Sequence, residues 1–383
     1  MSGRTGGLLD YPSVCGVSSC APWARRGLPH LFASAGSRPP LRHSAAWAAT
    51  SGPTRPAAAP RTIPPSRVFM EIARELQEIS LDLSRGSCVT VGNFDGVHNG
   101  HRKLIGRVMA KAAALGVPSV VVTFCPHPLR VLVGPHTPPL ITDYEKKLDL
   151  FEALGVDLTL MLRFTREMAA QEPEEFVRRV LVDALHVREL VIGYDFSLGK
   201  GRKGNFELLQ RLGAQYGFAT ERLDPVIIND AVVSSTRIRD LIRAGDVWDV
   251  RPLMDRFYAI RGKVVRGMDR GGKLLGFPTA NMEPRDELMP RPGVYATWVQ
   301  IDGQVYQGVT NVGYNPTFDN ARLSVETHIL DFDRDIYGWE IRVSFVHRLR
   351  DERKFSGLDE LVTQIRRDVD LARQILSAPD ARL

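Results

Sequence analysis

The sequence predicts an α/β domain with a parallel sheet, followed by an antiparallel β-barrel domain that ends in a helix. Three observations lead to this prediction. The 383 residues are about twice the length of a usual domain. A strand–glycine turn–helix–strand unit lies near the start of the first domain, which is typical of parallel sheets. Short alternating strands separated by glycine turns fill the second half, which is typical of barrels.

The composition excludes several classes of protein. Hydrophobic residues make up 44% of the chain and charged residues 25%, as in ordinary globular proteins. No run of about eighteen apolar residues occurs, so we expect no membrane-spanning helix. Four cysteines (Cys15, Cys20, Cys88 and Cys125) are too few for a disulfide scaffold, and they show no zinc-ligand spacing.

The net charge of +6 is concentrated in the N-terminal tail. Residues 1–69 contain eight arginines, one aspartate and no lysine or glutamate, so the tail carries +7 and the remaining chain −1. A basic surface for nucleic acid is therefore not predicted for the folded part. We expect neither a nucleic-acid partner nor a membrane partner.

The tail 1–69 is predicted to be disordered, because ten of the 25 prolines lie there and no hydrophobic period is present. Its arginine-rich, acid-poor composition also resembles an organelle transit peptide. A secretory signal peptide fits less well, since no clean apolar stretch follows a short basic start. We favour a third interpretation, in which Met70 is the working start. Two domains then follow, at 70–250 and 251–383.

The stretch SCVTVGNFDGVHNGHRKLIGRVMAKAAALG, residues 87–116, is the most informative part of the first domain. It predicts a buried strand at 88–91, a turn at Gly92 and Gly96, and a helix from about Asn99 to Gly116. A second buried strand is expected at 119–124. Such a unit places the N-terminus of a helix at the carboxyl edge of the sheet, where phosphates bind.

His98 and His101 lie at that predicted helix start, three residues apart. Two histidines in a turn are often merely solvated, but the strand, the glycines and the helix together favour phosphate binding. His127 in TFCPHP follows the next strand in the same way. The basic loop GYDFSLGKGRKGN, residues 193–205, suits polyphosphate, although a solvated mobile loop fits equally well.

The segment VSSTRIRDLIRAGD, residues 233–246, predicts a helix that begins near Ser235 and Thr236. Arg237 and Arg239 would lie in its first turn, where cations oppose the helix dipole. This local conflict indicates that an anion binds there.

Four blocks in one order, GNFDGVHNGH, TFCPHP, GYDFSLGKGRKGN and SSTRIR, resemble the adenylyltransferase module of bifunctional riboflavin kinase/FAD synthetases. The resemblance covers about residues 85–245 and implies a Rossmann-like nucleotidyltransferase fold. It implies that FMN attacks the ATP α-phosphate, with His98 and His101 on the ATP phosphates and Arg237, Ser235 and Thr236 on the β/γ side. It further implies nucleotide, phosphate or flavin contacts at Asn93, Asp95, Gly96, His127, Asp195 and Asn205.

The second domain carries two further candidate groups. GFPTAN places Thr279 and Asn281 two residues apart, as on one face of a strand, where their oxygens suit magnesium and a phosphate. Short polar residues in a turn are the alternative. SVETHIL places Glu326 between Val325 and Thr327 in a strand pattern. A carboxylate there suits a general base for an alcohol, and a plain solvent-facing side chain is the alternative.

GFPTAN, NVGYNPTF and VETHILD, in this order, resemble the riboflavin kinase module, over about residues 255–377. The resemblance implies that Glu326 activates the riboflavin 5′-hydroxyl and that Thr279 and Asn281 hold magnesium and ATP phosphates. The glycine loop 266–276, with Lys273 and Gly276, would cover the nucleotide. A final helix over 357–376 is expected to pack on the barrel.

Together the two resemblances imply an enzyme that makes FMN from riboflavin and then FAD from FMN, each time with ATP and Mg²⁺. We expect a bacterial cytoplasmic protein, with an organelle as the alternative if the tail is a transit peptide. A monomer or weak homo-oligomer is expected. A transferase acting on another phosphorylated precursor, a flavin sensor and a nucleic-acid-binding protein are the rival hypotheses.

Overall fold

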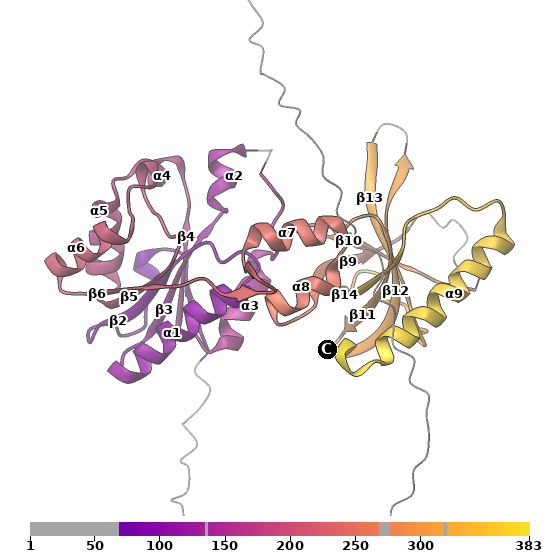
Figure 1. Cartoon of the computed structure of the whole chain (residues 1–383), viewed down its shortest axis with the longest axis horizontal. Coiled ribbons are helices and arrows are strands. Elements are labelled where there is room, and N and C mark those ends of the chain that lie inside the picture. The colour runs from indigo at the N-terminus through magenta and orange to yellow at the C-terminus, as the bar shows by residue number, and fades with distance from the viewer. Residues whose placement is uncertain (1–68, 135–136, 268–275, 318–319) are drawn as a thin grey trace, which may run out of the picture. The chain divides into compact units, whose positions relative to one another are not determined.

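The computed structural model describes residues 69–134, 137–267, 276–317 and 320–383 (Figure 1). The predictions for the tail up to residue 68, for Lys273 and for most of the glycine loop 266–276 concern residues outside these ranges. In the part of the chain that is described, no helix has the length and apolar character needed to span a membrane.

The first domain contains the predicted parallel sheet. Its six strands lie in the order β1-β4-β3-β2-β5-β6, and every neighbouring pair is parallel. Both faces are covered, so β2 is buried at all five positions. The strands are β1 (Glu71–Ala73), β2 (Ser87–Val91), β3 (Ser119–Cys125), β4 (Leu158–Arg163), β5 (Val187–Gly193) and β6 (Ala219–Leu223).

Helices form an apolar core on each face of this sheet. Leu104, Ile105 and Val108 of α1 pack on one face with Phe151 of α3, and the π-helix η3 and α6 pack on the other. These elements are α1 (Asn99–Leu115), α3 (Tyr144–Leu154), η3 (Val177–Ala184) and α6 (Phe206–Tyr216). Shorter helices are η1 (Leu76–Glu78), α2 (Pro128–Leu132), α4 (Arg166–Ala170), α5 (Pro173–Phe176) and η4 (Lys200–Arg202).

The second domain contains the predicted closed antiparallel barrel, in the order β10-β13-β12-β11-β14-β9. The C-terminal helix α9 (Leu358–Ser377) lies against the outside of this barrel (Figure 1). Its Ala372 and Leu376 belong to one buried cluster with Val294 and Val309 of the barrel. The strands are β9 (Tyr258–Val265), β10 (Ala280–Pro284), β11 (Gly293–Ile301), β12 (Gln304–Thr317), β13 (Asn320–Ile329) and β14 (Glu340–Arg350), and η5 (Pro379–Ala381) follows α9.

Two helices join the sheet to the barrel. After the hairpin β7 (Ile227–Ile228) and β8 (Ala231–Val232) come α7 (Ser235–Ala244) and α8 (Val247–Met254). Ile238 of α7 and Val250 of α8 belong to the same buried cluster as Tyr258 and Phe345 of the barrel. The predicted boundary at 250/251 falls inside α8, and the division into two domains stays a prediction.

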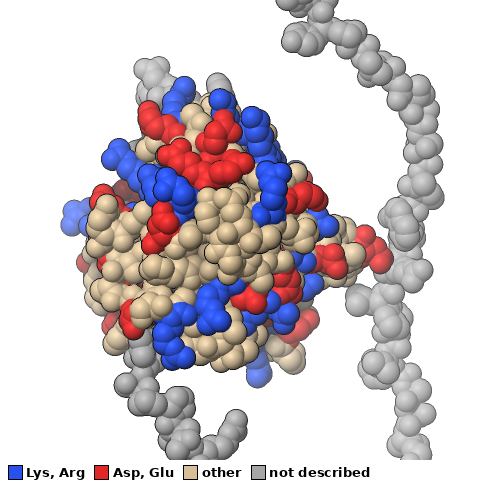
Figure 2. All heavy atoms as spheres, turned by 90° about the vertical axis from the view of Figure 1, so that its left-hand side faces the viewer, with Lys and Arg blue, Asp and Glu red and all other residues tan. Residues whose placement is uncertain are grey.

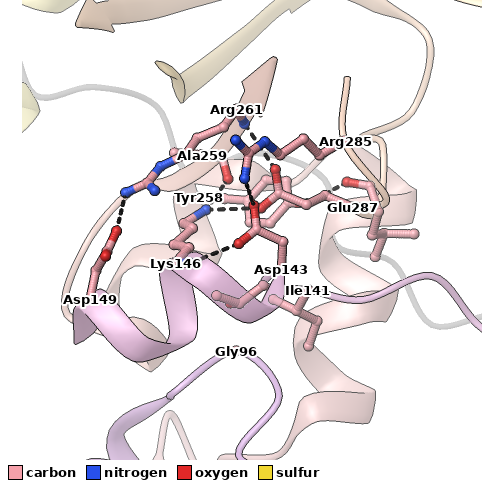
Figure 3. A network of polar contacts seen from close by, with 12 residues as sticks. Gly96, Ile141, Asp143, Lys146, Asp149, Tyr258, Ala259, Arg261, Arg285 and Glu287 are labelled. Carbon is pink, nitrogen blue, oxygen red and sulfur yellow. Dashed lines mark hydrogen bonds and ion pairs between the residues drawn. The ribbon is translucent and has the colours of Figure 1, made fainter. Parts of the chain in front are cut away.

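A polar network links α3 to the barrel (Figure 3). The Lys146 ammonium donates to Ala259 O and lies 3.2 Å from Glu287 Oε1. The other oxygen of Glu287 accepts the backbone N–H of Arg261 at 2.9 Å, and the Arg261 guanidinium pairs with Asp149 at 2.6 Å. Each charged group of this junction therefore has a hydrogen-bond or ion-pair partner, without which its burial would be costly.

Candidate active sites

The turn between β2 and α1 has an unusual backbone. Phe94 and Val97 adopt positive φ values of 50° and 38°, and Gly96 has a φ of 87°. A Cβ at Gly96 would lie 3.2 Å from the Ile141 side chain. Left-handed backbone at non-glycine residues is costly and is found most often at functional sites. The turn is thus held in this conformation by the structure around it.

His98 and His101 form a stacked pair at the start of α1. The two ring centroids are 3.6 Å apart with an interplanar angle of 17°. His98 is the N-cap, and its Nδ1 accepts the backbone N–H of His101 at 3.4 Å. A Cβ at Gly100 would lie 3.0 Å from His98 Cε1, so the glycine between the histidines leaves room for the ring. The predicted placement of both histidines at a helix N-terminus is confirmed.

Both histidines are neutral at pH 7. Burial, aided by the charge of Arg256, lowers the pKa of His98 to about 4. Burial and the neighbouring His98 and Lys147 hold the pKa of His101 well below its usual value. Because His98 Nδ1 accepts a hydrogen bond, its proton lies on Nε2. The ring therefore offers a neutral N–H donor to an anion.

His127 is arranged in the same way at the end of the next strand. It caps the short helix α2, and its Nδ1 accepts the N–H of Leu129 at 3.2 Å. Burial lowers the pKa of His127 to about 4, although the nearby Asp95 opposes this. Its own backbone N–H donates to the Tyr144 hydroxyl at 2.8 Å. A second neutral Nε2–H donor follows from this geometry.

Asp95 is a buried anchor of the turn. Its carboxylate accepts the backbone N–H groups of Ile141 and Thr142 at 3.0 and 3.1 Å, and it pairs with Arg239. Ser235, at the start of α7, donates its hydroxyl to Asp95 O at 2.9 Å. The starts of α1 and α7 therefore meet at one turn. Arg239, which the sequence led us to pair with a bound anion, has a carboxylate of the protein as its partner.

Lys147 is a buried cation that the sequence did not point to. Its Nζ donates to Asn93 O at 2.8 Å, and the residue is only 1% exposed. Burial lowers the pKa of Lys147, while Asp95 raises it. In the sequence Lys147 is one of two adjacent lysines in a pattern of apolar and charged residues. Nothing in that pattern distinguished the buried Lys147 from an exposed lysine.

Four more residues were predicted to bind phosphate, nucleotide or flavin, and the structure shows where each one lies. Arg237 donates to Ile228 O at 2.8 Å and to Ala231 O at 3.0 Å, so it holds the β7–β8 hairpin. Thr236 is exposed on α7. Asn205 is the N-cap of α6, and Asp195 is exposed after β5.

The basic loop expected to bind polyphosphate also has partners in the protein. Lys200 and Lys203 lie 3.6 and 3.8 Å from the Glu172 carboxylate. These pairs are exposed and therefore weak. Figure 2 shows basic and acidic side chains interspersed on one face of the described part. That distribution agrees with the near-neutral charge computed for the chain beyond the tail.

In the barrel, two predicted residues lie on neighbouring strands at the same level. Asn281 of β10 is the direct register partner of Glu326 of β13, which in turn faces Asn311 of β12. Glu326 is half-buried, whereas its neighbours Val325 and Thr327 are buried in the barrel. By strand alternation, Asn281, Glu326 and Asn311 share the outer face. This register is a property that the sequence could not supply.

The segment before β10 is fixed by His328. Its Nδ1 lies 2.8 Å from Pro278 O, and its ring packs edge-on against Phe277 with centroids 5.5 Å apart. Thr279 follows directly and precedes β10, so it lies at the strand entrance and not within the strand as predicted. Gly276, with a φ of 80°, is the first described residue after the glycine loop. His328 was missed because nothing in its strand pattern marked it.

Comparisons with known proteins give the family. The FAD synthetase model matches residues 81–237, and the riboflavin kinase model matches residues 254–376. This chain belongs to the bifunctional riboflavin kinase/FMN adenylyltransferase family. As a member, it phosphorylates riboflavin to FMN with ATP and adenylylates FMN to FAD. The order of the two modules agrees with the order predicted from the motifs.

The match to this chain spans nearly the whole length of several members of this family. The bifunctional riboflavin kinase/FMN adenylyltransferase of Pseudomonas fluorescens is 38% identical over 82% of this chain and 99% of its own. That of Escherichia coli K12 is 37% identical over 80% of this chain and 97% of its own. A crystal structure titled macrolide-efflux protein, from Streptococcus pneumoniae, covers 80% of this chain and 99% of its own, with 30% identity and a TM-score of 0.72. From that structure we take the shared fold alone.

Proposed function

We propose that the two reactions take place at separate sites of the chain. The stacked pair of His98 and His101 belongs to the adenylyltransferase, and Glu326 belongs to the kinase. The proposal of two sites is supported by one observation. The histidines lie at the edge of the parallel sheet, whereas Glu326 lies on the face of the barrel. Each site has the residue types that its own reaction needs.

In adenylyl transfer, the FMN phosphate is itself the nucleophile and needs no strong base. Its oxygen attacks the ATP α-phosphorus while the bond to pyrophosphate breaks. Neutral N–H donors from His98 and His101 and the amides at the start of α1 hold the ATP phosphates in line and stabilise the departing charge. His127 acts beside the reacting phosphates.

The remaining adenylyltransferase assignments follow the family resemblance. Ser235, Thr236 and Arg237 face the β/γ side of ATP. The contact from Ser235 to Asp95 O supports this, because it joins the start of α7 to the histidine-bearing turn. The assignments of Asn93, Asp95 and Gly96 to the nucleotide, and of Asp195 and Asn205 to the flavin and nucleotide, rest on the resemblance alone.

In the kinase, Glu326 accepts the proton of the riboflavin 5′-hydroxyl as that oxygen attacks the ATP γ-phosphorus and ADP leaves. A half-buried carboxylate is suited to this role. Thr279 and Asn281 hold the Mg²⁺ that accompanies ATP, and Lys273 and Gly276 cover the nucleotide. The donor set fits, because Mg²⁺ prefers oxygen ligands and takes few from the protein. Among the described residues, no group of three or more His, Cys, Asp or Glu side chains gathers to form a metal cage. The ion neutralises phosphate charge when bound.

The test is chromatography of the products of two variants supplied with ATP and Mg²⁺. Glu326→Ala should abolish FMN formation from riboflavin, yet convert supplied FMN to FAD at nearly the wild-type rate. His101→Ala should make FMN normally and lose FAD formation. Loss of both activities in either variant, with the fold intact by circular dichroism, would contradict the two-site proposal.

Three further proposals concern the chain as a whole. Domain limits of 70–250 and 251–383 are supported by the change from a parallel sheet to a barrel. A cytoplasmic location is supported by the bacterial relatives. A monomer or weak homo-oligomer, without nucleic-acid or membrane partners, is our expectation for the assembly.

A further inference from the structure

Arg256 connects the barrel end of the chain to the histidine-bearing turn. It lies between α8 and β9, 160 positions from Gly96. Its Nη2 donates to Gly96 O at 2.5 Å, and its Nη1 donates to Val97 O at 3.2 Å and to Met254 O at 3.0 Å. One guanidinium thus binds two consecutive carbonyls of the turn that precedes His98.

The same segment makes two more contacts with the start of α1. Asn99, between the two histidines, donates its side-chain amide to Pro252 O at 2.9 Å. Arg102 pairs with Asp255 at 3.4 Å. Residues 252–256 therefore contact the turn and the first helical turn of α1 on one side.

The hydrogen bond from Arg256 to Val97 O also sets the direction of the next backbone N–H group. In a trans peptide, C=O and N–H point in opposite directions. Fixing Val97 O on the guanidinium therefore turns the N–H of His98 away from Arg256. A partly buried cation behind the turn also adds positive potential at the start of α1, where the proposed ATP phosphates would lie. Burial lowers the pKa of Arg256 to about 9, so it stays charged at pH 7.

We propose that Arg256 is a positioning residue for adenylyl transfer, which fixes the turn between β2 and α1 and so places His98 and His101 at the start of α1. The proposal rests on the assignment of these histidines to the ATP phosphates. It also means that the adenylyltransferase site is completed by a residue outside the FAD synthetase match, which ends at residue 237. Arg256 lies within the riboflavin kinase match, which begins at residue 254.

The alternative is that Arg256 merely holds the two domains together. Arg261 provides the comparison, because it crosses the same junction to Asp149 at 2.6 Å without touching the turn. Arg261→Met is therefore the matched control for Arg256→Met. Both changes remove a junction cation and keep a side chain of similar length.

The experiment measures riboflavin phosphorylation and FMN adenylylation on one preparation of each full-length variant. For Arg256→Met we expect kcat/KM for FAD formation to fall about 100-fold, as small misplacements of a phosphate-binding group do. The kinase rate should stay within about twofold, because the hydrogen bonds of Arg256 among the described residues go to Gly96, Val97 and Met254 and not to β10 or β13. Arg256→Lys should recover part of the loss, since lysine keeps the charge but cannot bind both carbonyls. Arg261→Met should leave both reactions unchanged.

Equal losses in Arg256→Met and Arg261→Met would overturn the proposal, as would full FAD formation by Arg256→Met. If Arg256→Met does not fold, Arg256→Lys decides. It should lower FAD formation about tenfold with the kinase intact, and wild-type FAD formation would overturn the proposal. His101→Ala tests the underlying assignment separately. If that variant keeps FAD formation, the histidine assignment fails, whatever Arg256 does.

Discussion

Lys146 Nζ lies 3.2 Å from Glu287 Oε1, and the two side chains are only 3% and 0% exposed. This ion pair joins α3 to the segment between β10 and β11 (Figure 3). Burial lowers the pKa of Lys146 to about 8, and the Glu287 carboxylate opposes that shift. Each charge therefore depends on the other to remain in the interior.

Removing one partner should be more harmful than removing both. We expect Glu287→Ala to lower the free energy of unfolding by about 3–5 kcal/mol, because it leaves a buried ammonium without its counter-ion. Lys146→Met combined with Glu287→Leu should cost less than the single change. Urea unfolding followed by circular dichroism measures both. Asp149→Ala, which breaks an exposed pair, should cost less than about 1 kcal/mol. A double variant less stable than Glu287→Ala would contradict this account.

The glycine between the histidines should matter for catalysis and not for stability. In Gly100→Ala the new Cβ would lie 3.0 Å from His98 Cε1 and displace the ring. We expect FAD formation to fall by about tenfold or more, since misplaced phosphate donors are costly. FMN formation should be unchanged.

Gly106→Ala is the matched control in the same helix, because nothing lies within 4 Å of its Cβ position. It should raise the free energy of unfolding by about 0.5–1 kcal/mol and leave both activities intact. A Gly100→Ala variant with normal FAD formation would show that the ring position is unimportant.

The protonation of His98 and His127 can be followed directly. Burial lowers the pKa of each to about 4, from a usual value of 6.5. In two-dimensional NMR, their ring signals should not titrate between pH 7.5 and 5.5. FMN phosphate titrates near pH 6, so an activity profile alone would not identify the histidines. A midpoint near 6.5 for either ring would refute their neutral state.

The same shifts predict how stability depends on pH. Between about pH 6.5 and 4, the unfolded chain binds protons at these positions, and the folded chain does not. The unfolded state therefore gains protons as the pH falls, and the free energy of unfolding decreases over that range. His98→Asn should weaken this dependence in urea titrations at pH 7 and pH 5. An unchanged dependence would mean that other groups cause it.

The tail is expected to be dispensable. A protein that begins at Met70 should keep both activities within about twofold and unfold at the same temperature, since disordered segments bury little surface. Scanning calorimetry and the two product assays measure this. A protein that no longer folds would contradict the prediction of disorder.

Local patterns in the sequence were enough to predict several secondary-structure elements, the family and both reactions. The valine-rich strand 88–91, the glycine turn and the apolar spacing of 99–115 predicted β2 and α1, because burial and helix geometry act over a few residues. Alternation around Glu326 left a plain solvent-facing side chain as the alternative to a general base, and in the structure Glu326 is half-buried. The motif blocks then gave the family and both reactions.

Tertiary structure decided which residues meet. Arg256 contacts Gly96 across 160 positions, and Lys147 contacts Asn93 across 54. The sequence around Arg256 or Lys147 looks the same as that around a solvated arginine or lysine. Only the packing of the folded chain removes these side chains from water. Strand pairing likewise put Asn281 opposite Glu326, because register depends on the closed barrel as a whole.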